Sequence, residues 1–149
     1  MFTIDRTLDI DAPQALVWEV LTDFANYGQW NPFVPEARCD LRPGGAIEMQ
    51  VKLRDKPQFQ REWIIDVTPG VGFRYSMKAV PLGTLRSLRV QTLASLGEAR
   101  TRYTSHFEIA GWLQPLVTGI FGGGMRNGFE GMALGLKARA EALHAQRSR

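Results

Sequence analysis

The feature that most limits how this chain can fold is a run of five short segments that alternate apolar and polar residues. They cover residues 47–53, 59–67, 73–77, 85–96 and 101–109. Such alternation is typical of strands that bury one face, and short turns join neighbouring strands antiparallel. The sequence therefore predicts an antiparallel meander, to which an earlier alternating segment, residues 2–10, adds a further strand.

Helical patterns lie on both sides of this predicted meander. Residues 13–21 place apolar side chains at helical spacing directly after Asp11-Ala12-Pro13, which is a favourable start for a helix. Pro115 lies in the first turn of a second helical pattern, which continues to about residue 145. Proline is tolerated there because the amides of the first turn have no partner within the helix. The last element is therefore predicted to be one long C-terminal helix.

A stretch rich in aromatic residues, Asp23–Phe33, separates the first predicted helix from the meander. Tyr27 and Trp30 are three residues apart, so one helical turn would place both rings on the same face. Asn31-Pro32 then ends any helix, because the residue before a proline disfavours helical backbone angles. Phe33 adds a third ring. Three rings at such a break can pack into a core, or they can line the mouth of a pocket.

The order of strand, short helix, aromatic-rich break, several strands and one long C-terminal helix resembles the helix-grip superfamily, also termed SRPBCC. This superfamily contains the START-like lipid-binding domains and the polyketide cyclase/dehydrase-like proteins. The resemblance extends over residues 2–145. It implies an α+β fold in which an antiparallel sheet of about six or seven strands wraps around the C-terminal helix, with two short helices after the first strand. It also implies a ligand between this helix and the concave sheet.

Length and composition favour one folded unit. With 149 residues the chain can bury a core of its own, and we expect a single START-like ligand-binding domain over residues 1–149. Charged residues interrupt the N-terminal segment, which does not resemble a signal peptide, and no segment approaches the ~20 apolar residues of a membrane span. The single cysteine, Cys39, cannot form an internal disulfide. The expected location is the cytoplasm, with no integral membrane segment.

The net charge of +3 is concentrated at the C-terminal end, because four basic side chains and one acidic side chain lie in the last 13 residues. A nucleic-acid-binding protein should carry a basic stripe on its folded surface, so nucleic acid is not an expected partner. His106, His144 and Cys39 lack neighbours at metal-ligand spacing, so no metal site is predicted. The glycine-rich segment 119–128 contains neither GxGxxG nor a Gly-Lys-Ser/Thr sequence, and no cofactor is expected.

Four glycines in the predicted C-terminal helix, Gly124, Gly128, Gly131 and Gly135, fall on one stripe of the helix surface. Each costs about 0.5–1 kcal/mol relative to alanine in a helix interior, so the pattern requires a reason. Close approach of another segment is one explanation, and space for a ligand between helix and sheet is the other. The resemblance to the helix-grip superfamily favours the ligand, and the residues themselves leave both explanations open.

The candidate ligand-binding residues come from the aromatic break, the predicted inward strand faces and the C-terminal helix. Arg61 lies between Phe59 and Trp63 on one predicted face. If it points inward, its guanidinium requires a carboxylate or an acidic ligand; near a strand end, it reaches water instead. No catalytic residue is assigned, because the resemblance supplies no invariant triad. The predicted ligand-binding residues are Trp30, Phe33, Met49, Arg61, Trp63, Tyr75, Gln91, Tyr103, Phe107, Gly128 and Met132.

Three classes of function are compatible with this sequence. The first is binding of a small hydrophobic or amphipathic molecule in a cavity between the sheet and the C-terminal helix, by a monomer or homodimer. The second is an enzyme similar to polyketide cyclases or dehydratases, with an aromatic or polyketide-like substrate. The third is a protein-binding module similar to the chaperone activators of the superfamily. Two titratable side chains facing one cavity would favour the enzyme, and an entirely apolar cavity would favour a carrier or sensor.

Overall fold

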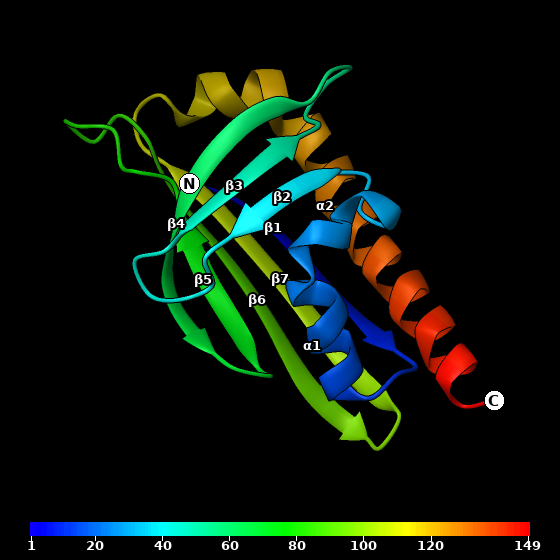
Figure 1. The fold of residues 1–149 in the computed structure, drawn as a ribbon. Coiled ribbons are helices and arrows are strands. Elements are labelled where there is room, and N and C mark those ends of the chain that lie inside the picture. Colours follow the sequence, from blue (N-terminus) through cyan, green and yellow to red (C-terminus); the bar gives the residue numbers. More distant parts are fainter.

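Seven strands form one curved antiparallel sheet in the order β1-β7-β6-β5-β4-β3-β2 (Figure 1). The structure is a computed structural model that describes residues 1–149. Consecutive strands from β2 to β7 are neighbours, as the alternating pattern predicted for β3 to β7, and β1 pairs with β7. The strands are β1 (Phe2–Ile10), β2 (Glu36–Cys39), β3 (Ala46–Val51), β4 (Gln58–Thr68), β5 (Gly72–Ser76), β6 (Arg86–Gly97) and β7 (Arg100–Ala110).

The short strand β2 is the one strand that the sequence did not predict. It has four residues, and only Ala37 among them is buried. A strand of this length contains too few alternating positions to give a periodic signal. Its pairing with β3 makes it one edge of the sheet, and β1 forms the other edge.

Two short helical segments carry the chain from one edge of the sheet to the other, as predicted. The helix α1 (Gln14–Thr22) follows β1, and the 3₁₀ helix η1 (Phe24–Gln29) leads toward β2. The rings of Tyr27 and Trp30 lie 4.9 Å apart between centroids, and both residues are buried in the core. Phe33 instead extends toward the C-terminal helix, where it contacts a phenylalanine ring. The aromatic break therefore contributes both to the core and to the space beneath the helix.

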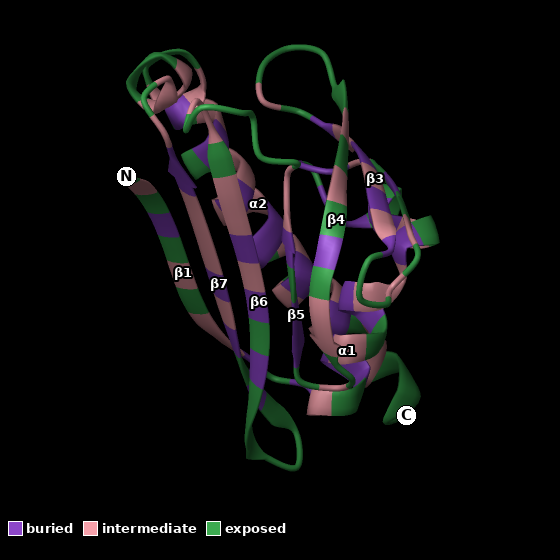
Figure 2. Cartoon of the chain, turned by 90° about the vertical axis from the view of Figure 1, so that its left-hand side faces the viewer, coloured by how far each residue is buried: buried purple, intermediate pink, exposed green.

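The C-terminal helix α2 (Gln114–Arg147) lies along the concave side of the sheet (Figures 1 and 2). It changes direction in its N-terminal part, which contains the consecutive glycines Gly122–Gly124 (Figure 1). Adjacent small residues are a common cause of such a bend. One face of α2 contributes to a core of 27 buried residues. Along β6, buried and exposed residues alternate, as expected for a strand with one face on this core (Figure 2).

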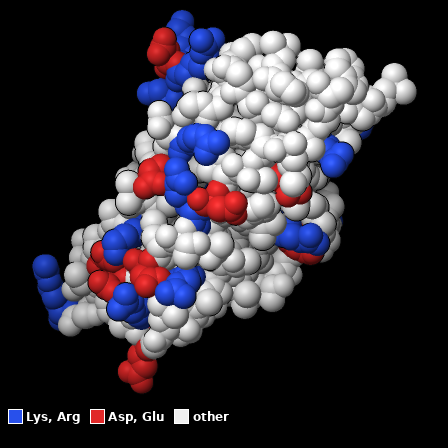
Figure 3. All heavy atoms as spheres, turned by 180° about the vertical axis from the view of Figure 1, so that it is seen from behind, with Lys and Arg blue, Asp and Glu red and all other residues white.

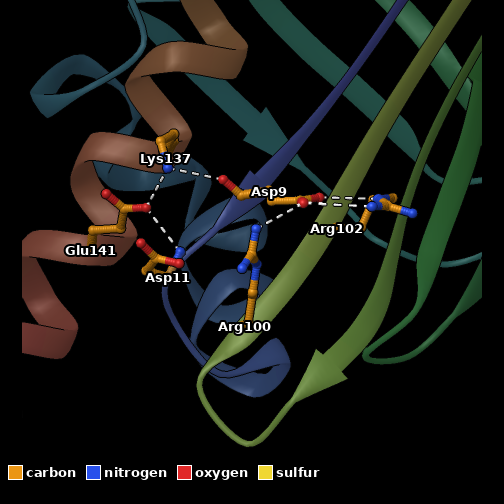
Figure 4. A network of polar contacts seen from close by, with 6 residues as sticks. All are labelled: Asp9, Asp11, Arg100, Arg102, Lys137 and Glu141. Atoms are coloured by element: carbon orange, nitrogen blue, oxygen red, sulfur yellow. Dashed lines mark hydrogen bonds and ion pairs between the residues drawn. The ribbon is translucent and has the colours of Figure 1, made fainter.

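A polar network fastens the C-terminal half of α2 to the end of β1 (Figure 4). The Lys137 ammonium donates to the backbone carbonyl of Asp9 at 2.9 Å and pairs with the Glu141 carboxylate at 2.6 Å. Glu141 also accepts a hydrogen bond of 2.8 Å from the backbone N–H of Asp11. The side chain of Asp9 pairs with two arginines of β7. The network holds helix, edge strand and its neighbour together at the end of the sheet away from the bend.

Basic and acidic side chains lie close together in several groups on the surface (Figure 3). A wide region at the upper right of this view carries no charged side chains. Three of the four basic residues at the C-terminal end lie in α2, and two of these form ion pairs, Lys137 with Glu141 and Arg147 with Glu19. None of the helices combines the length and the hydropathy that a membrane crossing requires.

Candidate functional site

A cavity of about 70 Å³ lies between α2 and the concave face of the sheet. Ten of its thirteen lining residues are hydrophobic, and the other three are Gln60, Glu62 and Arg89. This inner cavity is therefore an apolar chamber with polar groups supplied by β4 and β6. The hydrophobic lining consists of Phe33, Val34, Met49, Val51, Leu53, Tyr75, Phe107, Met125, Phe129 and Met132.

A larger hollow of about 340 Å³ adjoins the inner cavity on the side of the N-terminal part of α2. Five residues line both spaces, so the outer hollow and the inner cavity lie side by side beneath α2. The shared lining residues are Leu53, Gln60, Glu62, Phe107 and Met125. The apolar side chains that line only the outer hollow are Met77, Leu85, Ile109, Val117 and Phe121.

Arg89 of β6 borders the inner cavity and is only 2% exposed. Its Cζ lies 4.2 Å from the ring centroid of Phe129 on α2, a favourable cation–π geometry. Nη2 donates to the Tyr103 hydroxyl at 3.4 Å and lies 3.6 Å from the Met132 sulfur. Nε and Nη1 have no hydrogen-bond partner in the protein. Arg89 is therefore a buried cation whose donors are only partly used.

A short polar chain behind the cavity wall supports Arg89. The Tyr103 hydroxyl accepts the hydrogen bond from Arg89 and donates one of 2.6 Å to Oε1 of Gln91. Tyr103 and Gln91 are fully buried, and neither borders the cavity itself. Because all three residues lie on adjacent strands, the sheet determines where the guanidinium lies.

Glu62 of β4 borders both the inner cavity and the outer hollow. Burial raises the pKa of Glu62 to about 7, and the positive charge of Arg89 opposes this shift only in part. Burial also raises the pKa of Tyr75, on the neighbouring strand, well above its ordinary value. A carboxyl group with a pKa near neutrality can both accept and donate a proton. No cluster of three or more His, Cys, Asp or Glu side chains is arranged to hold a metal ion.

The structure divides the predicted ligand-binding residues into groups. Gln91 and Tyr103 lie behind the wall of the inner cavity, and Trp30 packs beside Tyr27 without bordering either space. Contact of these residues with a ligand stays a prediction. Those that border the inner cavity are Phe33, Met49, Tyr75, Phe107 and Met132.

The predicted inward orientation of Trp63 is wrong, and Arg61, for which the sequence left contact with water as the alternative, lies on the same outer face. Arg61 borders the outer hollow but not the inner cavity. Arg61 is exposed and pairs at 3.2 Å with a glutamate on the outer face of β3, and Trp63 is 40% exposed. The cause is a β-bulge between Ile64 and Asp66, which reverses the alternation within β4. After the bulge, Val67 packs on the core as the alternation predicted. Before the bulge, the even-numbered positions face inward instead, and the aromatic residues lie on the outer face.

The two charged groups of the cavity, Arg89 and Glu62, were not in the predicted set. A signal for Arg89 was present, because it lies two residues before Gln91 and therefore on the same strand face. No comparable signal existed for Glu62. The strand pattern favoured burial of the neighbouring aromatic residues, and the bulge that turns them outward becomes visible only in the pairing of β4 with β5.

The glycine stripe of α2 is a surface of close packing. A Cβ on Gly124 or Gly135 would clash with a backbone carbonyl, and a Cβ on Gly128 would clash with an aromatic ring. On Gly131 it would lie 3.1 Å from a proline Cγ. Gly128 therefore does not border the inner cavity, and its role is to let Phe33 lie beneath the helix. The groups that occupy this space are the carbonyls of Leu53 and Trp30, the ring of Phe33 and the Cγ of Pro32.

Comparison with known proteins gives a match over most of the chain. A family model described as "Polyketide cyclase / dehydrase and lipid transport" matches residues 1–141. A search of curated protein sequences finds no match.

Among solved structures, a START superfamily protein from Mycobacterium smegmatis is similar, with a TM-score of 0.72 and 17% identity, over 95% of this chain and 98% of that protein. The Zhui aromatase/cyclase from a Streptomyces species has a TM-score of 0.68 and 15% identity, over 99% and 96% of the two chains. A protein from Thermus thermophilus has a TM-score of 0.73 and 17% identity, over 95% and 99%. These similarities establish a START-like, helix-grip fold.

Proposed function

The chain belongs to the polyketide cyclase/dehydrase and lipid transport family, and from this premise we propose that it binds a small hydrophobic or amphipathic molecule between α2 and the sheet. The observation that carries the proposal is the apolar inner cavity that adjoins the outer hollow. Concave, mostly apolar sites with a few polar groups are typical of small-molecule binding. The START-like fold supports the same function, since it wraps a sheet around the helix that covers the cavity.

The volumes of the two spaces limit how such a ligand is placed. Small-molecule sites commonly enclose about 300–1,000 Å³. The inner cavity, at about 70 Å³, lies below this range, and the outer hollow, at about 340 Å³, lies within it. The body of the ligand therefore occupies the outer hollow, and only a small group enters the inner cavity. Each CH₂ buried in this way contributes roughly 0.8 kcal/mol to binding.

Binding of dodecan-1-ol and dodecanoate, measured by isothermal titration calorimetry, tests this proposal. Both molecules have an apolar chain and a small head group. Val51→Phe narrows the inner cavity and should weaken binding by about tenfold or more, because overpacking a filled space costs about 1–3 kcal/mol. Val71→Phe is the matched control, since Val71 is 42% exposed beyond β4. The proposal would be refuted if the wild-type protein bound neither dodecan-1-ol nor dodecanoate.

A second candidate function is acid–base catalysis on an aromatic or polyketide-like substrate. The observation that favours it is that a basic side chain, Arg89, and an acidic side chain, Glu62, border the same cavity. The Glu62 carboxylate would remove a proton from a carbon between two carbonyl groups, and Arg89 would stabilise the enolate oxygen that results. Attack of this enolate carbon on a second carbonyl, protonation of the new alkoxide and loss of water would give a dehydrated ring.

Ring closure can be followed by mass spectrometry as the loss of one water from a synthetic aryl poly-β-ketone. Glu62→Gln should reduce this reaction by about 10²-fold or more, which is typical for removal of a general base, and should leave binding in place. Glu48→Gln is the control, because Glu48 lies on the outer face of β3. If the wild-type protein binds the poly-β-ketone but does not convert it, catalysis is contradicted and ligand carriage remains as the function.

A further inference from the structure

The guanidinium of Arg89 carries a buried charge that no protein group neutralises. No ion pair joins Arg89 to an acidic side chain, and two of its three nitrogens lack any hydrogen-bond partner. Its remaining contacts are a long hydrogen bond to Tyr103, the sulfur of Met132 and the ring of Phe129. Tyr103, Met132 and Phe129 are all uncharged. A buried cation is expensive unless a counter-charge and hydrogen bonds compensate it, so the site lacks an anion.

Glu62 does not supply this anion in the free protein. Its carboxyl borders the same cavity but forms no ion pair and no hydrogen bond with Arg89. Burial raises the pKa of Glu62, which favours the neutral acid up to about neutral pH. As an acid, Glu62 can donate a hydrogen bond to a ligand and does not compete with it for the arginine.

We propose that the ligand is an amphipathic carboxylic acid whose carboxylate binds Arg89 in the inner cavity and whose apolar body lies in the outer hollow. The inference rests on the proposed binding function and adds the chemical class and the orientation of the ligand. Arginine is suited to this role because its planar fork of N–H donors matches the two oxygens of a carboxylate.

The shape of the site agrees with this orientation. The inner cavity, with a volume of about 70 Å³, is large enough for a carboxylate and a short piece of chain, whereas the outer hollow is larger and mostly apolar. The side chains of Gln60 and Tyr75 also border the inner cavity and make no hydrogen bond within the protein, so both are available to the ligand head group. The charged end of the ligand therefore enters first, and the apolar end lies toward the N-terminal part of α2.

The inner cavity contains one arginine, Arg89, and this single charge distinguishes between kinds of acidic head group. A carboxylate brings one negative charge, which Arg89 neutralises. A phosphate monoester carries about −1.5 to −2 charges at neutral pH and would leave an excess of negative charge beside Glu62. The site is therefore expected to prefer carboxylates to phosphates on the same apolar chain.

The inference is tested with four molecules that share one chain: dodecanoate, its methyl ester, dodecan-1-ol and dodecyl phosphate. Isothermal titration calorimetry near neutral pH should show dodecanoate binding about tenfold or more tightly than each of the other three. Arg89→Met, which retains length and packing, should remove this preference, and the two neutral molecules should bind as before. Arg74→Met is the matched control, because Arg74 lies on the outer face of the neighbouring strand, paired with Asp66.

The possible outcomes separate this inference from the function on which it rests. Equal binding of dodecanoate and dodecan-1-ol to the wild-type protein would overturn the acid preference and leave the binding function intact. Binding of none of the four molecules would overturn both. If Arg89→Met does not fold, the acid preference is tested by the relative affinities of the wild-type protein for the four molecules and by the dodecanoate affinity of Arg89→Lys. Arg89→Lys retains the charge without the fork, so it should bind dodecanoate more weakly than the wild type; unchanged affinity would contradict the forked contact.

Discussion

Glu62 is a cavity carboxyl group whose ionisation depends on the fold. Because burial raises its folded-state pKa to about 7 from an ordinary value of 4.5, the native state binds a proton more readily than the unfolded chain. The resulting stability is fully present below the unfolded pKa and is lost as the pH rises through the folded pKa. Glu62 therefore destabilises the protein above neutral pH.

Replacement of Glu62 by glutamine should reveal this effect. At about pH 8, Glu62→Gln should be more stable than the wild type by up to roughly 3 kcal/mol, and the difference should vanish at about pH 4. The free energy of unfolding in urea, measured across this pH range, checks the prediction. A constant difference between the two proteins at all pH values would show that the carboxyl group is not desolvated.

The same residue should make acid binding depend on pH. Arg89 on β6 and Tyr75 on β5 are the titratable groups that face Glu62, while α2 and β3 present apolar side chains such as Phe129 and Met49. As the pH rises through the raised pKa of Glu62, about 7, this residue becomes a carboxylate and competes with the ligand for Arg89. The affinity for dodecanoate should fall, and that for dodecan-1-ol should not change. In Glu62→Gln, calorimetry should give the same dodecanoate affinity on both sides of neutrality.

At the scale of elements, α2 combines two kinds of glycine. Gly119 and Gly123 have open space where a Cβ would lie, whereas Gly124 and Gly135 face a backbone carbonyl. The first kind allows the helix to bend and lowers its intrinsic stability. The second kind allows the segment after η1 and the segment after β3 to approach the helix axis. Only the second kind determines how α2 lies on the site.

Alanine substitutions at neighbouring positions should therefore have opposite effects. Gly123→Ala should stabilise the protein by about 0.5–1 kcal/mol, because alanine has the higher helix propensity. Gly124→Ala should destabilise it by about 1–3 kcal/mol, because the methyl group would clash with the carbonyl of Leu53. Thermal unfolding of the two variants gives the comparison. Stabilisation by both substitutions would mean that the helix does not pack closely at Gly124.

At the scale of the whole molecule, the proposed ligand site arises because the sheet curves around α2 and leaves two adjoining spaces. The polar network between α2 and the end of β1 lies away from the bend of the helix, and the outer hollow lies on the side of the bend (Figures 1 and 4). The apolar body of a ligand should therefore be limited in length by the residues around the N-terminal part of α2.

Narrowing the outer hollow should shorten the longest acid that binds. Val117→Trp adds a large ring to the wall of the outer hollow. It should lower the affinity for dodecanoate by about tenfold and change the affinity for hexanoate by no more than about twofold. Leu134→Trp is the control, since Leu134 is 52% exposed on α2 and borders neither space. Calorimetric titration with acids of increasing length gives the readout. An equal loss of affinity for short and long acids would mean that the apolar chain of the ligand does not lie in the outer hollow.

The sequence by itself determined the architecture, because period-two alternation, turn residues and a single long helical pattern admit few arrangements. It also placed Phe33, Met49 and Tyr75 at the cavity wall. Tertiary structure decided the chemistry of the site. The bulge in β4 turned Arg61 outward and Glu62 inward, and a bulge is a matter of strand pairing that local composition does not encode.

For the glycine stripe, too, the sequence determined one part of the outcome and the tertiary structure decided the other. Its regular spacing in the sequence determined that something approaches one face of α2, but not what approaches it. The identity of the neighbour, a backbone carbonyl or an aromatic ring, depends on segments about 70 to 100 residues earlier in the chain. Arg89 likewise could be assigned to an inward strand face by alternation alone. Its lack of a counter-charge emerged only when all the elements around the cavity were in place, because a buried charge is defined by every group that surrounds it.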